Sequence, residues 1–375
     1  QIRLAHKVAQ SAIVLLKNKN SILPLNKKIK KVAVVGPNAD NRYNMLGDYT
    51  APQEDENIKT VLDGVISKLS PSKVEYVRGC AIRDTTVNEI AEVVEAASRS
   101  EVIIAVVGGS SARDFKTSYQ ETGAAIADEK SISDMECGEG FDRATLTLLG
   151  KQQDLLNALK ATGKPLIVVY IEGRPLDKVW ASEYADALLT ASYPGQEGGY
   201  AIADVLFGDY NPAGRLPVSV PRSVGQIPVY YNKKAPCNHD YVEQAASPLY
   251  TFGYGLSYTT FEYSDLQVMR KSPCYFEVSF KVKNTGSYDG EEVAQLYLRD
   301  EYASVVQPLR QLKCFERFFL KRGEEKEIFF TLTEKDLSII DRNMKRVVET
   351  GDFRIMIGAS SDDIRLTKDI SVESL

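Results

Sequence analysis

Val102-Ile-Ile-Ala-Val-Val-Gly-Gly-Ser110 is the stretch of sequence that decides the fold of the first half of the chain. Six consecutive apolar residues are followed by two glycines, which is typical of a strand that is buried on both faces and ends in a loop. Such strands occur in mainly parallel sheets that helices cover, so this stretch predicts an α/β fold.

Apolar runs of the same kind lie on both sides of this stretch. They predict further strands at residues 32–36, 74–80, 166–171 and 187–190. Apolar residues at helical spacing predict helices near the start of the chain and at residues 60–69, 90–97, 149–159 and 197–207. This alternation predicts a mainly parallel sheet covered by helices, an α/β sandwich.

Two of these helices carry further signals. In the first one, Leu4, Val8 and Ala12 share one face. Because the sequence opens at Gln1 inside this helical pattern, we interpret its start as a cut end. Before the helix at residues 90–97, Thr86 and Glu89 have the spacing of a capping box, which would satisfy the first backbone N–H groups of that helix.

The period of the apolar residues changes to two in the last third of the chain. Residues 276–282 alternate between apolar and polar side chains, and further strand-like runs occur at 293–298, 314–320, 328–332 and 353–357. Short strands at this spacing predict an all-β, immunoglobulin-like antiparallel sandwich.

We therefore expect three parts: an α/β sandwich over residues 1–222, an aromatic-rich linker over 223–262, and the β-sandwich over 263–375. We interpret the linker rings as packing between the two domains.

Composition excludes several classes of function. The net charge is −5, so the basic surplus of a nucleic-acid-binding protein is absent. No run of eighteen apolar residues predicts a membrane span. With His6 and His239 as the only histidines, neither a His-rich metal site nor a Ser-His-Asp triad is expected, and we predict no metal or other cofactor. Of the five cysteines, Cys80, Cys274 and Cys314 lie in strand-like runs and are expected to be buried free thiols.

The long polar stretch from Ser110 to Arg143 is the candidate functional loop. It follows the strand at 102–107, and ligand sites in open α/β sheets gather beyond the carboxyl ends of the strands. Its end reads Ser133-Asp-Met-Glu-Cys-Gly-Glu-Gly-Phe-Asp-Arg143. By composition alone, such an acidic loop is either a catalytic carboxylate loop or a solvated surface loop, and the sequence pattern leaves both open.

Two other features have both a structural and a functional interpretation. The glycines after residues 34–35 and 106–107 follow strands but form neither Gly-x-Gly-x-x-Gly nor a P-loop, so nucleotide binding is not indicated. Trp180, the sole tryptophan, is interpreted as a packed side chain, with stacking on a sugar as the alternative.

Several separated motifs resemble the C-terminal half of family 3 glycoside hydrolases, which include β-glucosidases and β-xylosidases. The resemblance covers nearly the whole chain in order, and it identifies the last domain as a fibronectin type III-like module. The motifs that carry it are Ser11-Ala-Ile-Val-Leu-Leu-Lys-Asn18, Val32-Ala-Val-Val-Gly-Pro-Asn-Ala-Asp40, Gly138-Glu-Gly-Phe-Asp-Arg143, Gly195-Gln-Glu-Gly-Gly199, Gly208-Asp-Tyr-Asn-Pro-Ala-Gly-Arg-Leu-Pro217 and Phe252-Gly-Tyr-Gly-Leu-Ser-Tyr258.

The resemblance implies roles for the residues of the loop. In the family, the glutamate of the Gly-Glu-Gly motif is the general acid/base, which places that role on Glu139, with Glu136 as the alternative. Asp142 and Arg143 are expected to support the loop as an ion pair or clamp rather than to act chemically. The family's nucleophile is an aspartate on a preceding barrel domain, and the resemblance assigns no nucleophile in this chain.

The resemblance thus implies a retaining exo-β-glycosidase, a hydrolase that removes terminal β-linked sugars from oligosaccharides. This chain would supply the acid/base, and a barrel domain in cis or in trans would supply the nucleophile, so the isolated chain is expected to be inactive. The alternative is a non-catalytic carbohydrate-binding or interface fragment, whose exposed docking face would favour a homo-oligomer. A secreted or periplasmic location is implied by the family's substrates.

Overall fold

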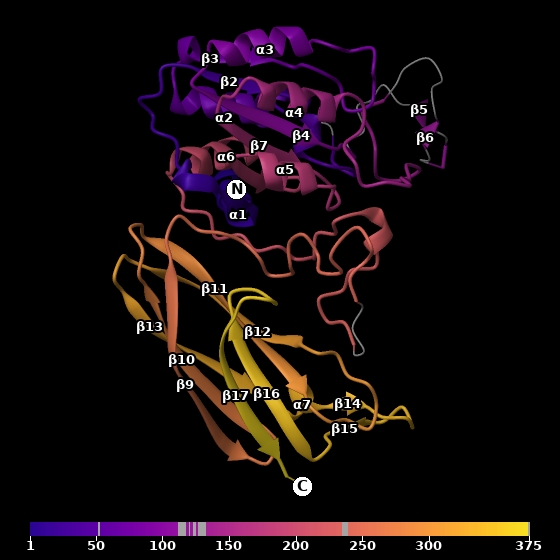
Figure 1. Ribbon diagram of the computed structural model, residues 1–375, viewed down its shortest axis with the longest axis vertical. Coiled ribbons are helices and arrows are strands. Elements are labelled where there is room, and N and C mark those ends of the chain that lie inside the picture. Colours follow the sequence, from indigo (N-terminus) through magenta and orange to yellow (C-terminus); the bar gives the residue numbers. More distant parts are fainter. Residues whose placement is uncertain are drawn as a thin grey trace. The chain divides into compact units, whose positions relative to one another are not determined.

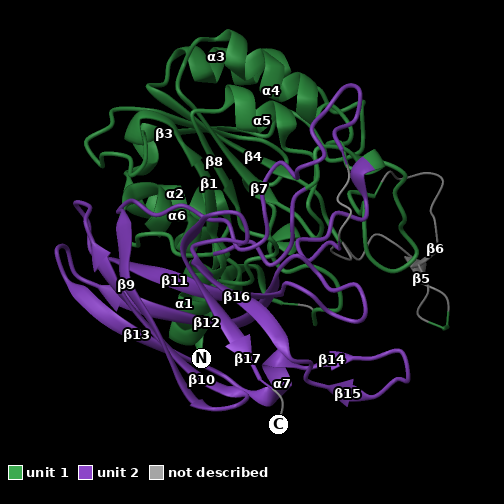
Figure 2. Ribbon diagram, turned by 60° about the horizontal axis from the view of Figure 1, so that its bottom comes forward, with its two compact units in different colours: residues 1–214, 221–225 green, residues 215–220, 226–375 purple. Residues whose placement is uncertain are grey.

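The computed structural model describes residues 1–51, 53–111, 118–119, 121–122, 125–126, 133–234 and 239–373. The chain divides into two compact units, shown in different colours in Figure 2. The first comprises Gln1–Gly214 with Pro221–Gly225, and the second comprises Arg215–Val220 with Gln226–Leu375. The stretch at 223–262, expected as a linker, is grouped with the second unit from Gln226 onward.

The first unit is built on a six-stranded sheet with the strand order β1-β8-β7-β4-β2-β3. All neighbours in it are parallel except β1, which runs antiparallel to β8. Every side chain of β2, β4, β7 and β8 is buried, which confirms the mainly parallel sheet covered on both faces. The strands are β1 (Val14–Asn18), β2 (Val32–Val35), β3 (Val74–Val77), β4 (Val102–Gly108), β7 (Leu166–Ile171) and β8 (Ala187–Thr190).

Helices cover both faces of this sheet. The elements are labelled in Figure 1, and Figure 2 shows α3 and α4 on one side of the strands and α1, α2 and α6 on the other. The helices are α1 (Ile2–Ala12), α2 (Val61–Lys68), α3 (Ile90–Ser98), α4 (Gln152–Ala161), α5 (Val179–Tyr184) and α6 (Gly198–Phe207). A capping box between Thr60 and Asp63 begins α2, and Gly208, with φ of 78°, ends α6 in the left-handed conformation.

The capping box expected for α3 is wrong. Thr86 is engaged by a local turn, because its backbone N–H and its hydroxyl both donate to Asp84. Glu89 instead accepts a hydrogen bond from the backbone N–H of Gly79, 3.1 Å away. Helix α3 therefore begins after Glu89 without a side-chain cap.

The apolar face of α1 is exposed rather than buried. Leu4 is 66% exposed and Val8 is 59% exposed. The helix is held through its other face, where His6 and Gln10 contact Asp204 of α6 at 2.7 and 2.6 Å. Polar contacts with Asp204 together with the burial of Ala9, rather than the predicted apolar face, therefore attach α1 to this unit.

The second unit is a β-sandwich. Its two main sheets have three strands in the order β13-β10-β9 and four in the order β12-β11-β16-β17. The core between them includes Val278, Phe280, Leu296 and Ile355. This confirms the fold class. The elements are β9 (Phe261–Ser272), β10 (Tyr275–Asn284), β11 (Gly290–Asp300), β12 (Gln311–Leu320), β13 (Glu325–Leu332), α7 (Glu334–Leu337), β14 (Ile339–Ile340), β15 (Arg346–Val347), β16 (Gly351–Gly358) and β17 (Ile364–Val372).

Among the cysteines that the structure describes, Cys80 and Cys274 are buried free thiols, as expected, while Cys314 is only half-buried. Burial raises the pKa of Cys80 to about 12, so its thiol stays protonated at neutral pH. Trp180 lies on α5, half-buried, and packs against Tyr184 with a ring-centroid distance of 5.2 Å.

Candidate active site

The acidic loop returns to the carboxyl end of β4. The backbone N–H of Gly109 donates to the carbonyl of Ile171 on β7, and the N–H of Glu136 donates to the carbonyl of Ser110, both at 2.9 Å. These bonds fasten the segment from Met135 to Cys137 directly beyond the central strand. The loop therefore lies at the carboxyl ends of the strands, where the sequence placed it. Much of the loop before it, between residues 112 and 132, lies outside the described residues.

Glu136 is buried at the base of this loop. It is 3% exposed, and its Oε2 lies 2.6 Å from Nη1 of Arg143. Its Oε1 lies so close to Gly109 that a Cβ there would be 2.0 Å away. A side chain at position 109, directly after β4, would therefore displace the Glu136 carboxylate from the strand end.

Glu139 differs from Glu136 in its exposure and in the conformation of the backbone around it. Its side chain is exposed, and it is flanked by Gly138 and Gly140 with φ of 108° and 80°. Both flanking conformations are ones that residues with a Cβ rarely adopt. The Gly-Glu-Gly motif thus bends the backbone on both sides of the carboxylate and projects it away from the buried base of the loop.

Tyr49 is a partner of Glu139 that the sequence did not indicate. Its hydroxyl donates a hydrogen bond to Oε2 of Glu139 at 2.7 Å, from a ring that is 74% exposed. Tyr49 itself has φ of 56°, in the left-handed region. The preceding Asp48 lies next to Gly138, where a Cβ would be 3.0 Å from its Oδ2. The loop containing Asp48 and Tyr49 thus faces the acidic loop.

The remaining predicted residues have structural contacts. Arg143 binds Glu136 and the carbonyl of Thr147, so it connects the segments before and after the Gly-Glu-Gly motif. Asp142 is exposed. Arg83 adds a second clamp, donating to the carbonyl of Met135 at 2.8 Å while its guanidinium lies 5.9 Å from the ring centroid of Phe141.

A half-buried tyrosine packs against the loop. The hydroxyl of Tyr193 lies 3.2 Å from Sγ of Cys137. A Cβ on Gly47 or Gly173 would meet its ring at about 2.7 Å, so both glycines make room for it. Burial raises the pKa of Tyr193 and of Cys137, so both groups stay protonated. The only sequence signal for this contact was the position of Tyr193 two residues before the glycine-rich motif at 195–199.

Within the described residues, no group of three or more His, Cys, Asp or Glu side chains could hold a metal ion. No helix in that part of the chain is long and apolar enough to cross a membrane.

An α/β sandwich with a carboxylate loop at its strand ends, followed by a fibronectin-like sandwich, defines the C-terminal part of a class of glycoside hydrolases. Residues 13–258 match the glycosyl hydrolase family 3 C-terminal domain, and residues 292–361 match the fibronectin type III-like domain. The chain belongs to glycosyl hydrolase family 3, as the sequence motifs predicted.

Curated relatives agree with this assignment. A β-xylosidase from Formosa agariphila is 40% identical, over 96% of this chain and 49% of its own length. A periplasmic β-glucosidase from Salmonella typhimurium is 39% identical, again over 96% of this chain and 49% of its own length. The chain thus spans about half the length of the curated relatives it matches.

Solved structures of the family have the same fold. A β-glucosidase from Erythrobacter marinus superposes with a TM-score of 0.87 at 36% identity, covering 98% of this chain and 50% of that one. A β-glucosidase from Listeria innocua in complex with isofagomine gives a TM-score of 0.85 at 31% identity, covering 98% of this chain and 49% of that one.

Proposed function

We propose that this chain supplies the general acid/base of a retaining exo-β-glycosidase that removes terminal β-linked glucose or xylose from oligosaccharides. The observation that carries the proposal is the placement of Glu139, an exposed carboxyl between two left-handed glycines beyond the central strand. A general acid must reach the oxygen that it protonates, and Glu139 has that access.

The proposed reaction has two steps. In the first, a carboxylate nucleophile attacks the anomeric carbon while Glu139 gives its proton to the departing glycosidic oxygen. In the second, Glu139 takes a proton from water, which attacks the anomeric carbon and releases the sugar and the nucleophile. The nucleophile is proposed to lie on a barrel domain, in cis or in trans, so that its carboxyl and that of Glu139 are about 5–5.5 Å apart in the working enzyme.

Glu136 is a poorer candidate for this proton transfer. Its carboxylate is buried against Gly109, and Arg143 already occupies one of its oxygens at 2.6 Å. A glycosidic oxygen could reach it only if that contact opened. We assign Glu136 and Arg143 the role of anchoring the loop, so that Glu139 is held at a fixed height above the strand ends.

The names of the relatives support the substrate class. The matched proteins include β-xylosidases and β-glucosidases, which is why the proposal names both sugars. One of them is described as periplasmic, which supports a secreted or periplasmic location for this protein.

A second candidate function is an interface role without chemistry. The observation that favours it is the exposed apolar face of α1, which includes Leu4 and Val8. Such a face fits contact with another domain, and the two roles are compatible if that domain is the barrel.

The decisive experiment replaces Glu139 by Ala in the full-length enzyme and measures hydrolysis of aryl β-glucosides and β-xylosides. We expect the rate to fall by about 10²–10⁴-fold for phenyl glycosides, which need a proton on the departing oxygen. Dinitrophenyl glycosides depart without that proton, so their first step should fall much less. Azide, which needs no general base, should restore turnover and yield the glycosyl azide.

The matched control is Glu136→Gln, assayed on the same two substrates. Its effect should be similar for both leaving groups and should accompany lost stability, because it disturbs an anchor. If Glu139→Ala leaves hydrolysis of the phenyl glycoside unchanged, the assignment is wrong. Turnover by the purified 375-residue chain alone would refute the proposed need for a separate nucleophile.

A further inference from the structure

A pocket of about 310 Å³ lies within the second unit, and none of the residues that line it belongs to the acid/base loop. Its walls come from five parts of the chain: Ser219 and residues 226–234, 241–251, 309–310 and 361–362. Its size falls at the lower end of the range of small-molecule sites, about 300–1,000 Å³. The pocket is therefore large enough to enclose one or two sugar rings.

Hydrogen bonds hold these walls together. The backbone N–H of Leu309 donates to the carbonyl of Lys233 at 3.0 Å, and that of Ser361 donates to the carbonyl of Phe252 at 2.9 Å. Nε2 of the buried Gln226 lies 2.9–3.2 Å from the carbonyls of residues 245–247. Backbone segments that are far apart in the sequence are thus fixed around one cavity, which makes it a formed site rather than a gap between loops.

Tyrosine rings supply flat surfaces in this pocket. Tyr231 is stacked on Phe252, with ring centroids 4.2 Å apart, and its hydroxyl accepts a hydrogen bond from the N–H of Leu312. Tyr230 and Tyr241 are more open, with exposed fractions of 67% and 39%. A ring with one apolar face and one polar edge suits the faces of a sugar.

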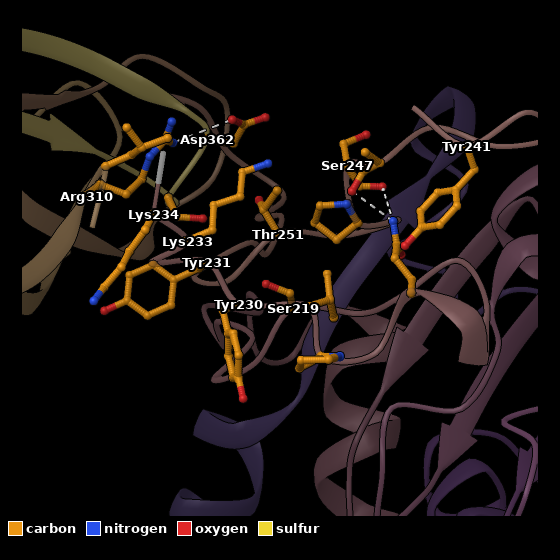
Figure 3. Close-up of a pocket in the computed structure, with 17 residues that line it drawn as sticks. Ser219, Tyr230, Tyr231, Lys233, Lys234, Tyr241, Ser247, Thr251, Arg310 and Asp362 are labelled. Atoms are coloured by element: carbon orange, nitrogen blue, oxygen red, sulfur yellow. Dashed lines mark hydrogen bonds and ion pairs between the residues drawn. The ribbon is translucent and has the colours of Figure 1, made fainter. Parts of the chain in front are cut away.

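Positive charge dominates the polar groups of the pocket. Lys233, Lys234 and Arg310 line it together with one acidic residue, Asp362. Arg310 and Asp362 are 3.6 Å apart, whereas neither lysine ammonium has an ion-pair partner among the residues that the structure describes. The view in Figure 3 shows the three cations on one side of the pocket and Tyr241 on the other. This excess stands out because the whole chain has a net charge of −5.

We propose that this pocket binds an oligosaccharide that carries a carboxylate, such as a uronic acid residue. The tyrosines would receive the sugar rings, the hydroxyls of Ser219 and Thr251 would bind sugar hydroxyls, and Lys233 and Lys234 would pair with the carboxylate. A neutral sugar would make no ion pair with Lys233 or Lys234, and a simple anion would not stack on the tyrosine rings. The proposal does not rest on the catalytic role of Glu139.

The test measures binding by isothermal titration calorimetry on the 375-residue chain. The probes are a xylo-oligosaccharide with one glucuronic acid branch, the unbranched neutral xylo-oligosaccharide of the same length, and inorganic sulfate. We expect saturable binding of the acidic probe, weakened by added salt, and binding of the neutral probe about tenfold or more weaker.

Variants separate the pocket from unspecific attraction. The double variant Lys233→Met/Lys234→Met should weaken binding of the acidic probe by about tenfold or more, to the level of the neutral one. The control Lys321→Met/Arg322→Met removes another adjacent, exposed basic pair in the same unit and should leave the affinity unchanged. Glu139→Gln should also leave it unchanged.

Several results would overturn the proposal. These are absence of saturable binding, equal affinity for the acidic and neutral probes, equal loss of affinity in the control pair, and displacement by sulfate as effective as by the acidic sugar. Loss of binding in Glu139→Gln would move the ligand to the acid/base loop, and the pocket assignment would fall while the proposed function stood.

Discussion

At the scale of single residues, the acidic loop is anchored at its start, and its tip is exposed. Glu136, Arg143 and Tyr193 are packed against the strand ends, while Glu139 is exposed between two glycines. The hydroxyl of Tyr49 donates a hydrogen bond to Oε2 of Glu139 at 2.7 Å. We infer that Tyr49 holds the carboxyl of Glu139 where it can reach the departing oxygen of a bound substrate.

Tyr49→Phe tests this positioning role. Losing a hydrogen bond to a charged or polar partner costs about 1–3 kcal/mol, so we expect kcat for phenyl β-glycosides to fall by about tenfold. The fall should be smaller for dinitrophenyl glycosides, because their departure needs no proton. A merely structural defect would slow both substrates alike.

The control for this variant is Tyr184→Phe, an exposed tyrosine on α5 of the same unit. It should leave both rates unchanged. Equal slowing of the two substrates by Tyr49→Phe would contradict the positioning role.

At the residue scale, the sequence pointed to Glu139, whose acid/base role stays a prediction, but it did not indicate the contacts around that residue. The Gly-Glu-Gly motif is local, so it can be read from adjacent residues. Tyr49 is 90 positions away from Glu139, and its contact depends on how two loops meet above the sheet.

The burial of Lys178 could not be predicted either, because its pairing with Glu172 at 2.6 Å needs the turn after β7 to fold back. Burial lowers the pKa of Lys178, although the charge of Glu172 works against this.

At the scale of elements, α1 is attached by a polar network around one carboxylate. Asp204 of α6 is 7% exposed and binds His6, Gln10 and Lys68, the last of which also lies 2.8 Å from Asp209. Three helices therefore meet at a single buried acidic side chain. Since Leu4 and Val8 of α1 are exposed, we infer that this network contributes much of the attachment of the helix to its unit.

Asp204→Asn should destabilise the first unit by about 1–3 kcal/mol, because it removes the charge of a buried carboxylate that accepts several hydrogen bonds and leaves Lys68 with Asp209 as its charged partner. Urea unfolding measures the loss, and hydrogen exchange should show α1 losing protection first. The control is Glu95→Gln, which removes an exposed ion pair with Arg99 within α3. That change should cost less than about 1 kcal/mol. An Asp204 variant as stable as the Glu95 variant would show that other contacts attach α1.

The elements themselves were predicted with uneven success, for a physical reason. Strands β7 and β8 have the bounds that their apolar runs indicated, because a strand buried on both faces is apolar throughout. Strands β9 and β17 were not anticipated. Each is the edge of its sheet and keeps many exposed side chains, so its alternation is weak.

At the scale of the whole molecule, the two units have separate cores. The first is centred on the strands β2, β4, β7 and β8, and the second on the rings and aliphatic side chains between its two sheets. Phe280 lies in the middle of the second core, fully buried and stacked on Tyr263 at 6.0 Å between ring centroids. Damage to the second core should therefore leave the acidic loop of the first unit folded.

Phe280→Ala tests that independence. Emptying so large a buried site should cost about 3–5 kcal/mol, and the cost should fall on the second unit alone. Hydrogen exchange measured by mass spectrometry should show β10, β11 and β16 losing protection, while β4 and β7 keep theirs. The matched control is Phe329→Ala, on the exposed face of β13, where the ring is 65% exposed and its loss should cost much less. If β4 and β7 lose protection together with β10, the two units unfold as one, and the acid/base loop depends on the β-sandwich for its stability.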